Sequence, residues 1–311
     1  MSGDPSRPQS LETAFDGVDA VLLSPRAVGS ATADLLTLAA GRGVRRVVIL
    51  SAATVAHPAG YPRFSDHFRA VEEAAAASGL RWTFLRCTDF ASNALAWAPQ
   101  IRAAGVVRGA YPEAATSPIH PRDIAAVAFQ ALVSDDHTGR AYVISGPESL
   151  TQRDKVHLIG QAVGGELSFQ ELAPEQVRQG MLAQGLPEDV PDRLLGSLAD
   201  YAKQPGPSTD TVRQLLGRPA LTFAEWADEN AGAFLPSAGR SRLHDRSFRR
   251  AGGLPIATVR GWREERRQGR GGRGRRSGDR LFSGTRPWRK VGRRAAACQG
   301  RCSGSGCRSR R

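Results

Sequence analysis

The sequence has 311 residues, enough to bury a sizeable core in one or two domains. Its net charge of +13 is uneven: residues 240–311 carry 23 Lys and Arg against 4 Asp and Glu, whereas residues 1–239 carry a net charge of −6. No apolar run approaches the ~18 residues of a membrane span, and Cys87 is the one cysteine before residue 240. We therefore expect an acidic globular body in a reducing compartment, the cytoplasm, followed by a basic tail.

Buried strands alternate with helices in the first half of the chain. The central one, Val44–Ser51, is a short apolar run that is typical of a parallel strand buried on both faces. Strands separated by helices of ten or more residues predict an α/β fold with a parallel sheet. The expected strands are Val18–Leu23, Val44–Ser51, Arg81–Arg86 and Arg140–Ser145. The expected helices are residues 10–15, 30–40, 65–78 with Ser65 as N-cap, 90–104 with a break near Pro99, and 121–133.

Beyond Gly146 the pattern becomes mostly helical. A helix capped by Ser149 or Thr151 is expected to run to Val163, and further helices over residues 175–184, 189–203, 210–216 and 223–234, with a short strand at 166–171 as an option. After Phe234 the apolar periodicity ends and Arg and Gly dominate, so residues 237–311 are expected to be disordered.

Several segments resemble the NmrA-like branch of the atypical short-chain dehydrogenases, in order and at the family's spacing, over about residues 3–235. They are FDGVDAV (15–21), the strand 44–51, SGLRWTFLR (78–86), IHPRDIA (119–125), SGPESLT (145–151), and GRP (217–219) with TFAEWA (222–227). The resemblance implies a partial NAD(P)-binding Rossmann domain over residues 1–147 and a helical substrate or cap region over 148–236. It also implies NAD or NADP as cofactor and a small-molecule acceptor as substrate.

The phosphate-binding part of that family pattern is missing. The family opens with a strand and a Gly-x-x-Gly-x-x-Gly loop, whose glycines let the backbone approach the cofactor's pyrophosphate. No such loop follows a strand here, and Gly3-Asp4 resembles the family segment just after its third strand. We therefore expect a chain that lacks the first three strands. In the strand order 3-2-1-4-5-6 this would leave Val18–Leu23 as an exposed apolar edge.

The dehydrogenase pair Tyr-x-x-x-Lys is also absent. The corresponding spacing in the helix after Ser51 gives Phe64 and Phe68, and Tyr61 is followed by Ser65 rather than lysine. Neither pair can pass a proton at neutral pH. The departure leaves two functions open: an NAD(P)H-dependent oxidoreductase, impaired in this form, and a non-catalytic regulator that senses the redox state of the nucleotide.

Cofactor-contacting residues are expected where the strands end, because open α/β sheets bind ligands at that edge. Ser51 could equally end its strand by bonding local backbone. The family usually has Pro and Gly directly after the arginine at the position of Arg86. Their absence here changes the backbone conformations that the loop prefers. The expected cofactor residues are Ser24, Pro25, Ser51, Ala52, Arg86, Cys87 and Thr88.

His67, in the first turn of its helix, is the candidate acid or base, against the alternative of a solvated or capping histidine. Asn93 and Trp97 share one helical face, and with His120 they are the candidate substrate-pocket residues, although Trp97 also suits a core position. Asp123 reads as a first-turn complement to the helix dipole. Cys87 alternatively reads as an inert buried thiol. No cluster has metal-ligand spacing, so no metal is expected.

The tail contains GRGGRGRR (269–276). Such segments bind nucleic acid through phosphate contacts, so nucleic acid is a partner only through the tail. The alternative is a frame-shifted or read-through translation, because the composition switches abruptly after Phe234. Self-association into a homo-oligomer is left open.

Overall fold

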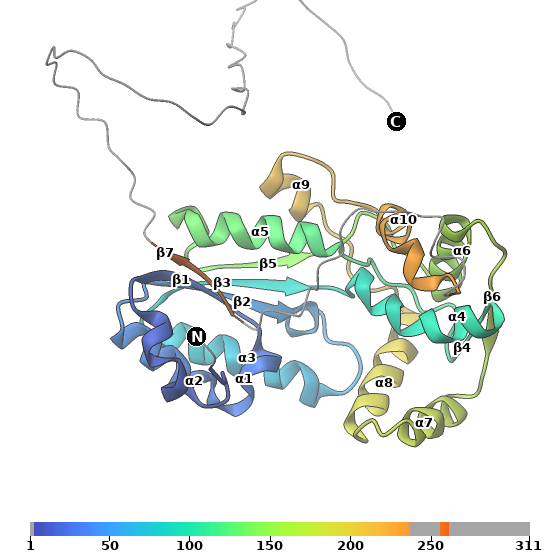
Figure 1. The fold of residues 1–311 in the computed structure, drawn as a ribbon, viewed down its shortest axis with the longest axis horizontal. Helices are drawn as coiled ribbons and strands as arrows, with labels where there is room; N and C mark the ends of the chain where they lie inside the picture. The colour runs from blue at the N-terminus through green and yellow to red at the C-terminus, as the bar shows by residue number, and fades with distance from the viewer. Residues whose placement is uncertain (1–2, 237–255, 261–311) are drawn as a thin grey trace, which may run out of the picture. The chain divides into compact units, whose positions relative to one another are not determined.

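A twisted sheet lies at the centre of the fold (Figure 1). The computed structural model describes residues 3–236 and 256–260, all within one compact unit, Met1–Glu264; the second unit, Glu265–Arg311, lies outside the described residues. Within the described ranges the sheet has five strands in the order β5-β3-β2-β1-β7, of which the first four are parallel and β7 is antiparallel to β1. The strands are β1 (Val18–Leu23), β2 (Arg46–Ala52), β3 (Arg81–Cys87), β5 (Arg140–Ile144) and β7 (Ile256–Arg260).

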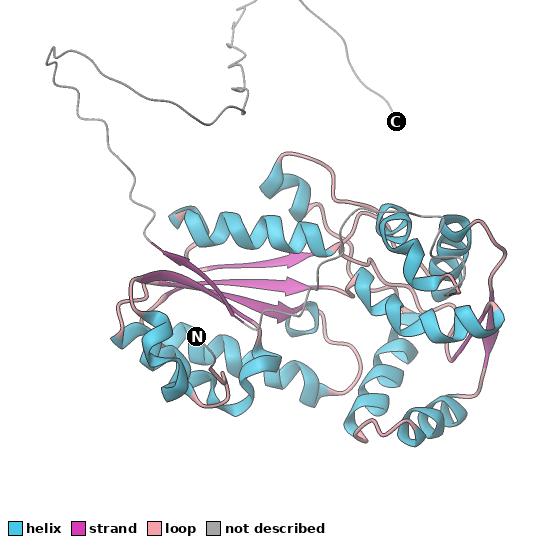
Figure 2. Cartoon of the chain, in the orientation of Figure 1, coloured by secondary structure: helices cyan, strands magenta, loops and turns pink. Residues whose placement is uncertain are grey.

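Helices cover both faces of the sheet (Figure 2). On one face lie α1 (Pro25–Val28), α2 (Thr32–Gly41) and α3 (Pro62–Ala77), and on the other lie α5 (Pro121–Val133) and α9 (Thr211–Leu216). Short 3-10 helices complete the connections: η1 (Pro8–Phe15), η2 (Gly29–Ala31), η3 (Ala53–Val55) and η5 (Asp135–His137).

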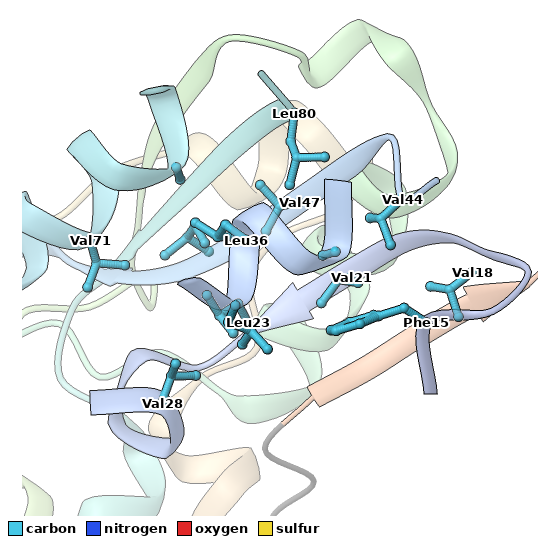
Figure 3. Close-up of a cluster of buried hydrophobic side chains, with 14 of the residues drawn as sticks. Phe15, Val18, Val21, Leu23, Val28, Leu36, Val44, Val47, Val71 and Leu80 are labelled. Atoms are coloured by element: carbon cyan, nitrogen blue, oxygen red, sulfur yellow. The ribbon is translucent and has the colours of Figure 1, made fainter. Parts of the chain in front are cut away.

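The apolar faces of these elements form two cores. Between the sheet and α2 and α3, Leu23, Leu36 and Val47 pack together with their neighbours and are almost completely buried (Figure 3). Burial of each such side chain contributes about 1.5–3 kcal/mol. On the other face, Val48 and Leu85 from the strands pack against the residues of α5 and α9. Both faces of the central strands are therefore apolar, as expected of a parallel sheet.

The remaining elements gather beyond the carboxyl ends of β2, β3 and β5, toward which the strand arrows point (Figure 1). They are η4 (Ala91–Trp97), α4 (Ala98–Ala104), β4 (Val106–Gly109), α6 (Gln152–Val163), β6 (Ser168–Glu171), α7 (Pro174–Ala183), α8 (Asp189–Lys203) and α10 (Phe223–Phe234). β4 and β6 pair in parallel as a separate small sheet. Phe223, Trp226 and Phe234 anchor a third core between α4, α6 and α10.

The central prediction is confirmed: β1 and β2 lie side by side and run in the same direction, from Ala20 opposite Arg46 to Leu23 opposite Ile49. The start of α3 differs from the prediction. Tyr61 is its N-cap and Pro62 its first residue, while the Ser65 hydroxyl donates to the Pro62 carbonyl at 2.8 Å. Proline, whose fixed φ suits a first helical turn, sets this boundary instead of serine.

The segment after β3 also differs in detail. It begins as the 3-10 helix η4 and changes to α-helix at Ala98, one residue before the expected break at Pro99. Strand β4 was not predicted. It is only four residues long and begins directly after Gly105, whose left-handed backbone ends α4. Such a run is too short to show the alternation that marks a strand.

The expectation that β1 forms an exposed edge is wrong for this structure. β7 lies beside β1, from Val18 opposite Arg260 to Leu23 opposite Ile256. Those five residues of the predicted disordered tail are therefore a strand, and the rest of residues 237–311, including the GRGGRGRR segment, lies outside the described residues. Apolar periodicity could not indicate β7, because the surrounding sequence shows none.

Candidate functional site

The carboxyl ends of β1, β2 and β3 lie next to one another in the sheet, where open α/β folds bind ligands. After β1, Ser24 is the extended N-cap of α1 and makes no capping bond through its side chain, and Pro25 is buried as the first helical residue. Ala52 ends β2 half-buried. The sheet thus brings together the ends at which cofactor residues were predicted.

Ser51 points into a buried ionic cluster. Its hydroxyl donates to Oε1 of Glu72 at 2.5 Å, and Arg86 grips the same carboxylate with two hydrogen bonds, Nε to Oε1 at 3.0 Å and Nη2 to Oε2 at 2.6 Å. Glu72 is only 5% exposed. The hydrogen bond to Glu72 raises the pKa of Arg86 further, so the guanidinium stays charged. Glu72 thus links α3 to β2 through Ser51 and to β3 through Arg86. The Ser51 hydroxyl bonds a side chain rather than the local backbone.

The next two residues fix the loop after β3. The Cys87 thiol is buried and donates to the Leu85 carbonyl, and burial raises its pKa to about 12. Such a thiol carries almost no thiolate at neutral pH. The Thr88 hydroxyl donates to the Ser117 carbonyl at 2.7 Å. The loop is therefore tied to the segment that precedes α5.

Directly after this loop a second charged cluster forms around Asp89. Lys155, on the buried face of α6, donates from Nζ to Oδ2 of Asp89 at 3.0 Å and to the Thr116 hydroxyl at 2.6 Å. Thr116 in turn donates to the same Asp89 oxygen at 3.0 Å, and Asn93 donates to Oδ1 at 2.7 Å. Both carboxylate oxygens are thus engaged. We call these four residues the Asp89 cluster.

The Asp89 cluster keeps its carboxylate ionised. Burial by itself would raise the pKa of Asp89, but the charge of Lys155 and the hydrogen bonds from Asn93, Lys155 and Thr116 outweigh burial and lower it below its usual value. The Lys155 side chain is 6% exposed, whereas the Asp89 side chain is 28% exposed. The Asp89 side chain therefore reaches the molecular surface while that of Lys155 does not.

Helix α8 is fastened to the loops at this edge by two consecutive residues. The Asp200 carboxylate accepts a hydrogen bond from the Gly60 N–H at 2.7 Å, in the loop after β2. The Tyr201 carbonyl accepts one from the Ala115 N–H at 3.2 Å, next to Thr116. Burial and then the charges of Asp89 and Asp200 raise the pKa of the Tyr201 phenol. Because Ala115 directly precedes Thr116, its bond to the Tyr201 carbonyl brings the backbone of Tyr201 next to the Asp89 cluster.

Three other predicted site residues have different surroundings. His67 is exposed on α3 and packs edge-on against the Phe68 ring, with centroids 5.5 Å apart. Trp97 is half-buried against the core of α4, α6 and α10. His120 is buried as the N-cap of α5: its Nδ1 accepts from the Arg122 N–H at 3.1 Å, and its Nε2 lies 3.4 Å from a Glu229 oxygen. Of the predicted pocket residues, Asn93 is the one that joins the Asp89 cluster.

Asp123, expected to complement the helix dipole, does more than that. It is fully buried and accepts hydrogen bonds from Arg218 Nη2 at 2.6 Å and from the Leu221 N–H at 2.7 Å. It therefore ties the segment before α10 to the first turn of α5.

Sequence reasoning missed Glu72, Asp89, Thr116, Lys155 and Tyr201. One signal was present: Lys155 lies on the apolar face of its helix with Val156 and Ile159, where a lysine needs a buried partner. The partner comes from a loop 66 residues away, and the fold alone brings the two together.

Within the described residues, no group of three or more His, Cys, Asp or Glu side chains is placed to hold a metal ion. The same part of the chain contains no helix that is both long and apolar enough to cross a membrane.

A whole dinucleotide requires a cradle for its pyrophosphate, and residues 3–236 and 256–260 do not supply one. β1 runs directly into Ser24, Pro25 and the four-residue α1, and β2 runs into the 3-10 helix η3. No glycine-rich loop joins a described strand to the N-terminus of a helix in either place. The strand ends fit the edge at which such a cofactor lies, but the described residues do not fit its phosphates.

Comparison with known proteins identifies the family. The sequence family described as NAD(P)H-binding matches residues 1–135. The chain is 39% identical over 229 residues to a (4-alkanoyl-5-oxo-2,5-dihydrofuran-3-yl)methyl phosphate reductase of Streptomyces griseus, covering 73% of this chain and 81% of that protein. It is 34% identical over 238 residues to an NAD(P)H azoreductase of Xenophilus azovorans, covering 75% and 82%.

Solved structures agree on the fold. The NADPH complex of the quinone oxidoreductase QOR2 of Escherichia coli superimposes with a TM-score of 0.64 at 23% identity, over 73% of this chain and 82% of that one. A triphenylmethane reductase of Citrobacter sp. superimposes with a TM-score of 0.61 at 18% identity, over 74% and 81%. By its identity to the two reductases of Streptomyces griseus and Xenophilus azovorans, the chain belongs to the NAD(P)H-binding family of Rossmann-fold proteins.

Proposed function

We propose that this protein is an NAD(P)H-dependent reductase of a small conjugated acceptor such as a quinone or an unsaturated lactone. The observation that carries the proposal is the 39% identity to a dihydrofuranone phosphate reductase over 81% of that protein's length. The names of further relatives, an azoreductase and a quinone oxidoreductase, also denote conjugated acceptors. We place the protein in the NmrA-like branch of the atypical short-chain dehydrogenases and in the cytoplasm.

The acceptor site of this proposal lies where the loop after β3, the segment before α5 and helix α8 meet. The Asp89 cluster and Tyr201 supply its polar groups, and Asn93 is the predicted pocket residue that belongs to it. Ser24 and Ala52, at neighbouring strand ends, are proposed to flank the cofactor. His67 is exposed on α3, and the proposed site assigns it no role.

The proposal is tested by following NADPH oxidation by the purified chain in the presence of a quinone, an azo dye and an alkanoyl dihydrofuranone. We expect turnover of at least one of them, with a preference between NADPH and NADH that the assay reads directly. Absence of turnover, together with unchanged nucleotide binding when each acceptor is added, would favour the redox-sensing regulator instead.

Cofactor affinity tests the missing phosphate cradle separately. We propose that this chain lacks the family's glycine-rich loop, so its affinity for NADPH is weaker than micromolar and its turnover is low. Titration of NADPH into the chain by calorimetry measures this affinity. Micromolar or tighter binding would contradict the missing cradle without contradicting the reductase.

A further inference from the structure

The hydroxyl of Tyr201 is a hydrogen-bond donor without a partner at the acceptor edge. The side chain is half-buried on α8, and among the described residues nothing accepts a hydrogen bond from its phenol, although its carbonyl is bonded to the Ala115 N–H. The phenol oxygen is not among the buried side-chain atoms that lack a partner, so it reaches solvent. A ligand at this edge would replace that water with an atom that accepts a hydrogen bond.

The position of this phenol is fixed by packing. Gly206 donates its N–H to the Ala115 carbonyl at 2.9 Å, and a Cβ at Gly206 would lie 3.2 Å from Cε1 of Tyr201. Gly206 thus packs closely beside the ring. Asp200 holds the preceding residue of α8 to the loop after β2. Tyr201 is therefore held between the loop after β2 and the segment that precedes α5.

The nearby carboxylate is not the partner of the phenol in this structure. Asp89 already accepts from Asn93 on one oxygen and from Lys155 and Thr116 on the other. Burial, and then the negative charges of Asp89 and Asp200, raise the pKa of the phenol, so the hydroxyl stays a donor at neutral pH. The same two negative charges disfavour an anionic group at this point. A neutral oxygen that only accepts hydrogen bonds is the best complement.

We propose that the Tyr201 hydroxyl donates a hydrogen bond to the carbonyl oxygen of the acceptor, and that Lys155, by holding Asp89, positions the loop that faces it. This inference rests on the proposed function, because it assigns a carbonyl group to the acceptor. At this point the ligand presents the uncharged carbonyl oxygen of a conjugated compound, either a quinone or an unsaturated lactone. Tyr201 contacts the ligand, whereas Lys155 and Thr116 act through Asp89.

The test uses duroquinone, a neutral quinone whose fully methylated ring resists addition of thiols, and the full chain without nucleotide. Calorimetry compares the wild type with Tyr201→Phe. Loss of one neutral hydrogen bond is expected to weaken binding by about 5–10-fold. Tyr142→Phe is the matched control, because Tyr142 is also half-buried but bonds His137 through its hydroxyl. The control is expected to bind like the wild type.

A spectroscopic readout separates a ligand contact from a packing role. The chain has four tyrosines, and carbon-13 NMR of their Cζ atoms follows the ionisation of each phenol. Duroquinone is expected to shift the Tyr201 resonance and raise its pKa, because the carbonyl binds only the protonated phenol. Phe variants of the other three tyrosines assign this resonance by elimination, so the readout survives even if Tyr201→Phe fails to fold.

Three results would overturn the inference: no binding of duroquinone by the wild type, equal affinity in Tyr201→Phe, or a Tyr201 resonance that duroquinone leaves unchanged. Failure of the proposed function gives a different pattern. A chain that binds duroquinone through Tyr201 but oxidises no NADPH contradicts the reductase alone. Turnover of duroquinone with the same KM in Tyr201→Phe contradicts this inference alone.

Discussion

Lys155 is a buried charged residue that stabilises the Asp89 cluster. Its ammonium is buried on α6, and its two bonds to Asp89 and Thr116 replace the water that it loses. Removing it leaves a carboxylate that is 28% exposed and has lost its counter-charge. Lys155→Met is therefore expected to destabilise the fold by about 2–4 kcal/mol, below the full cost of a completely buried pair because solvent still reaches Asp89. Urea denaturation measures the loss.

The double variant Lys155→Met with Asp89→Asn is the control for this prediction. It removes both charges, so it is expected to recover more than half of the lost stability. A double variant as unstable as the single one would show that Lys155 contributes by packing rather than by charge.

The pH dependence of stability gives a second measurement for the pair of Lys155 and Asp89. The folded-state pKa of Asp89 is lowered, so its contribution to stability is present above the unfolded value of about 3.9 and is lost as pH falls through the folded pKa. Without Lys155 the opposing effect of burial dominates, and the carboxylate protonates at higher pH. The midpoint of acid unfolding of Lys155→Met is expected at a higher pH than that of the wild type, as measured by circular dichroism. An identical midpoint would contradict the coupling.

The surroundings of Cys87 are expected to make its thiol unreactive. Burial raises the pKa of its thiol to about 12, and the residue is 5% exposed. In a variant with Cys298, Cys302 and Cys307 changed to serine, the native protein is expected to resist alkylation at pH 8 and to react once unfolded in urea. Mass spectrometry counts the adducts. Rapid labelling of the native variant would place Cys87 at an accessible edge of the site.

At the scale of elements, the position of α8 depends on close contact with the loop after β2. Gly60 has φ +71°, and a Cβ there would lie 2.5 Å from Oγ and 2.8 Å from N of Ser197. Gly60→Ala is expected to cost about 1–3 kcal/mol and to loosen α8, which also moves Tyr201. Thermal denaturation gives the cost, and hydrogen exchange of the α8 amides gives the loosening.

Gly180, inside α7, provides the matched glycine. A Cβ at that position would meet nothing within 4 Å, so Gly180→Ala is expected to be neutral or to stabilise by up to about 1 kcal/mol through helix propensity. If both alanine variants behave alike, the contact between Gly60 and Ser197 does not position α8.

Elements with strong local signals could be predicted from the sequence. β1, α5, α8 and α10 have the expected bounds, because apolar periodicity, Pro121 at the start of α5 and the Thr222 cap of α10 are all local. β4 and β7 could not be predicted, because each is four or five residues long and depends on its partner strand for its hydrogen bonds. Strand pairing over long separations leaves little trace in a short stretch.

The candidate site was less predictable than the fold for the same reason. Parallel strands must end at one edge, so the position of the site followed from strand order alone. Its polar network did not, because Asp89, Thr116, Lys155 and Tyr201 come from four separate segments. Their partners are set by how α6 and α8 pack beyond the sheet.

For the molecule as a whole, β7 covers β1, which would otherwise be the edge strand of the sheet. It pairs with the apolar β1 at the sheet edge, and an unpaired edge of this kind is a template for pairing with another chain. Thr258 lies opposite Val21 in this pairing. Thr258→Pro removes a backbone N–H from the middle of β7, so it is expected to release the strand and expose β1.

The released edge should show itself as self-association. We expect Thr258→Pro to form concentration-dependent oligomers in analytical ultracentrifugation while keeping the helical signal of the body, because an exposed β1 can pair with the same strand of a second molecule. Thr258→Val, which keeps the N–H and suits a strand, is expected to sediment like the wild type. If Thr258→Pro sediments like Thr258→Val at every concentration, then β7 does not protect this edge, and some other feature of the chain keeps β1 from pairing.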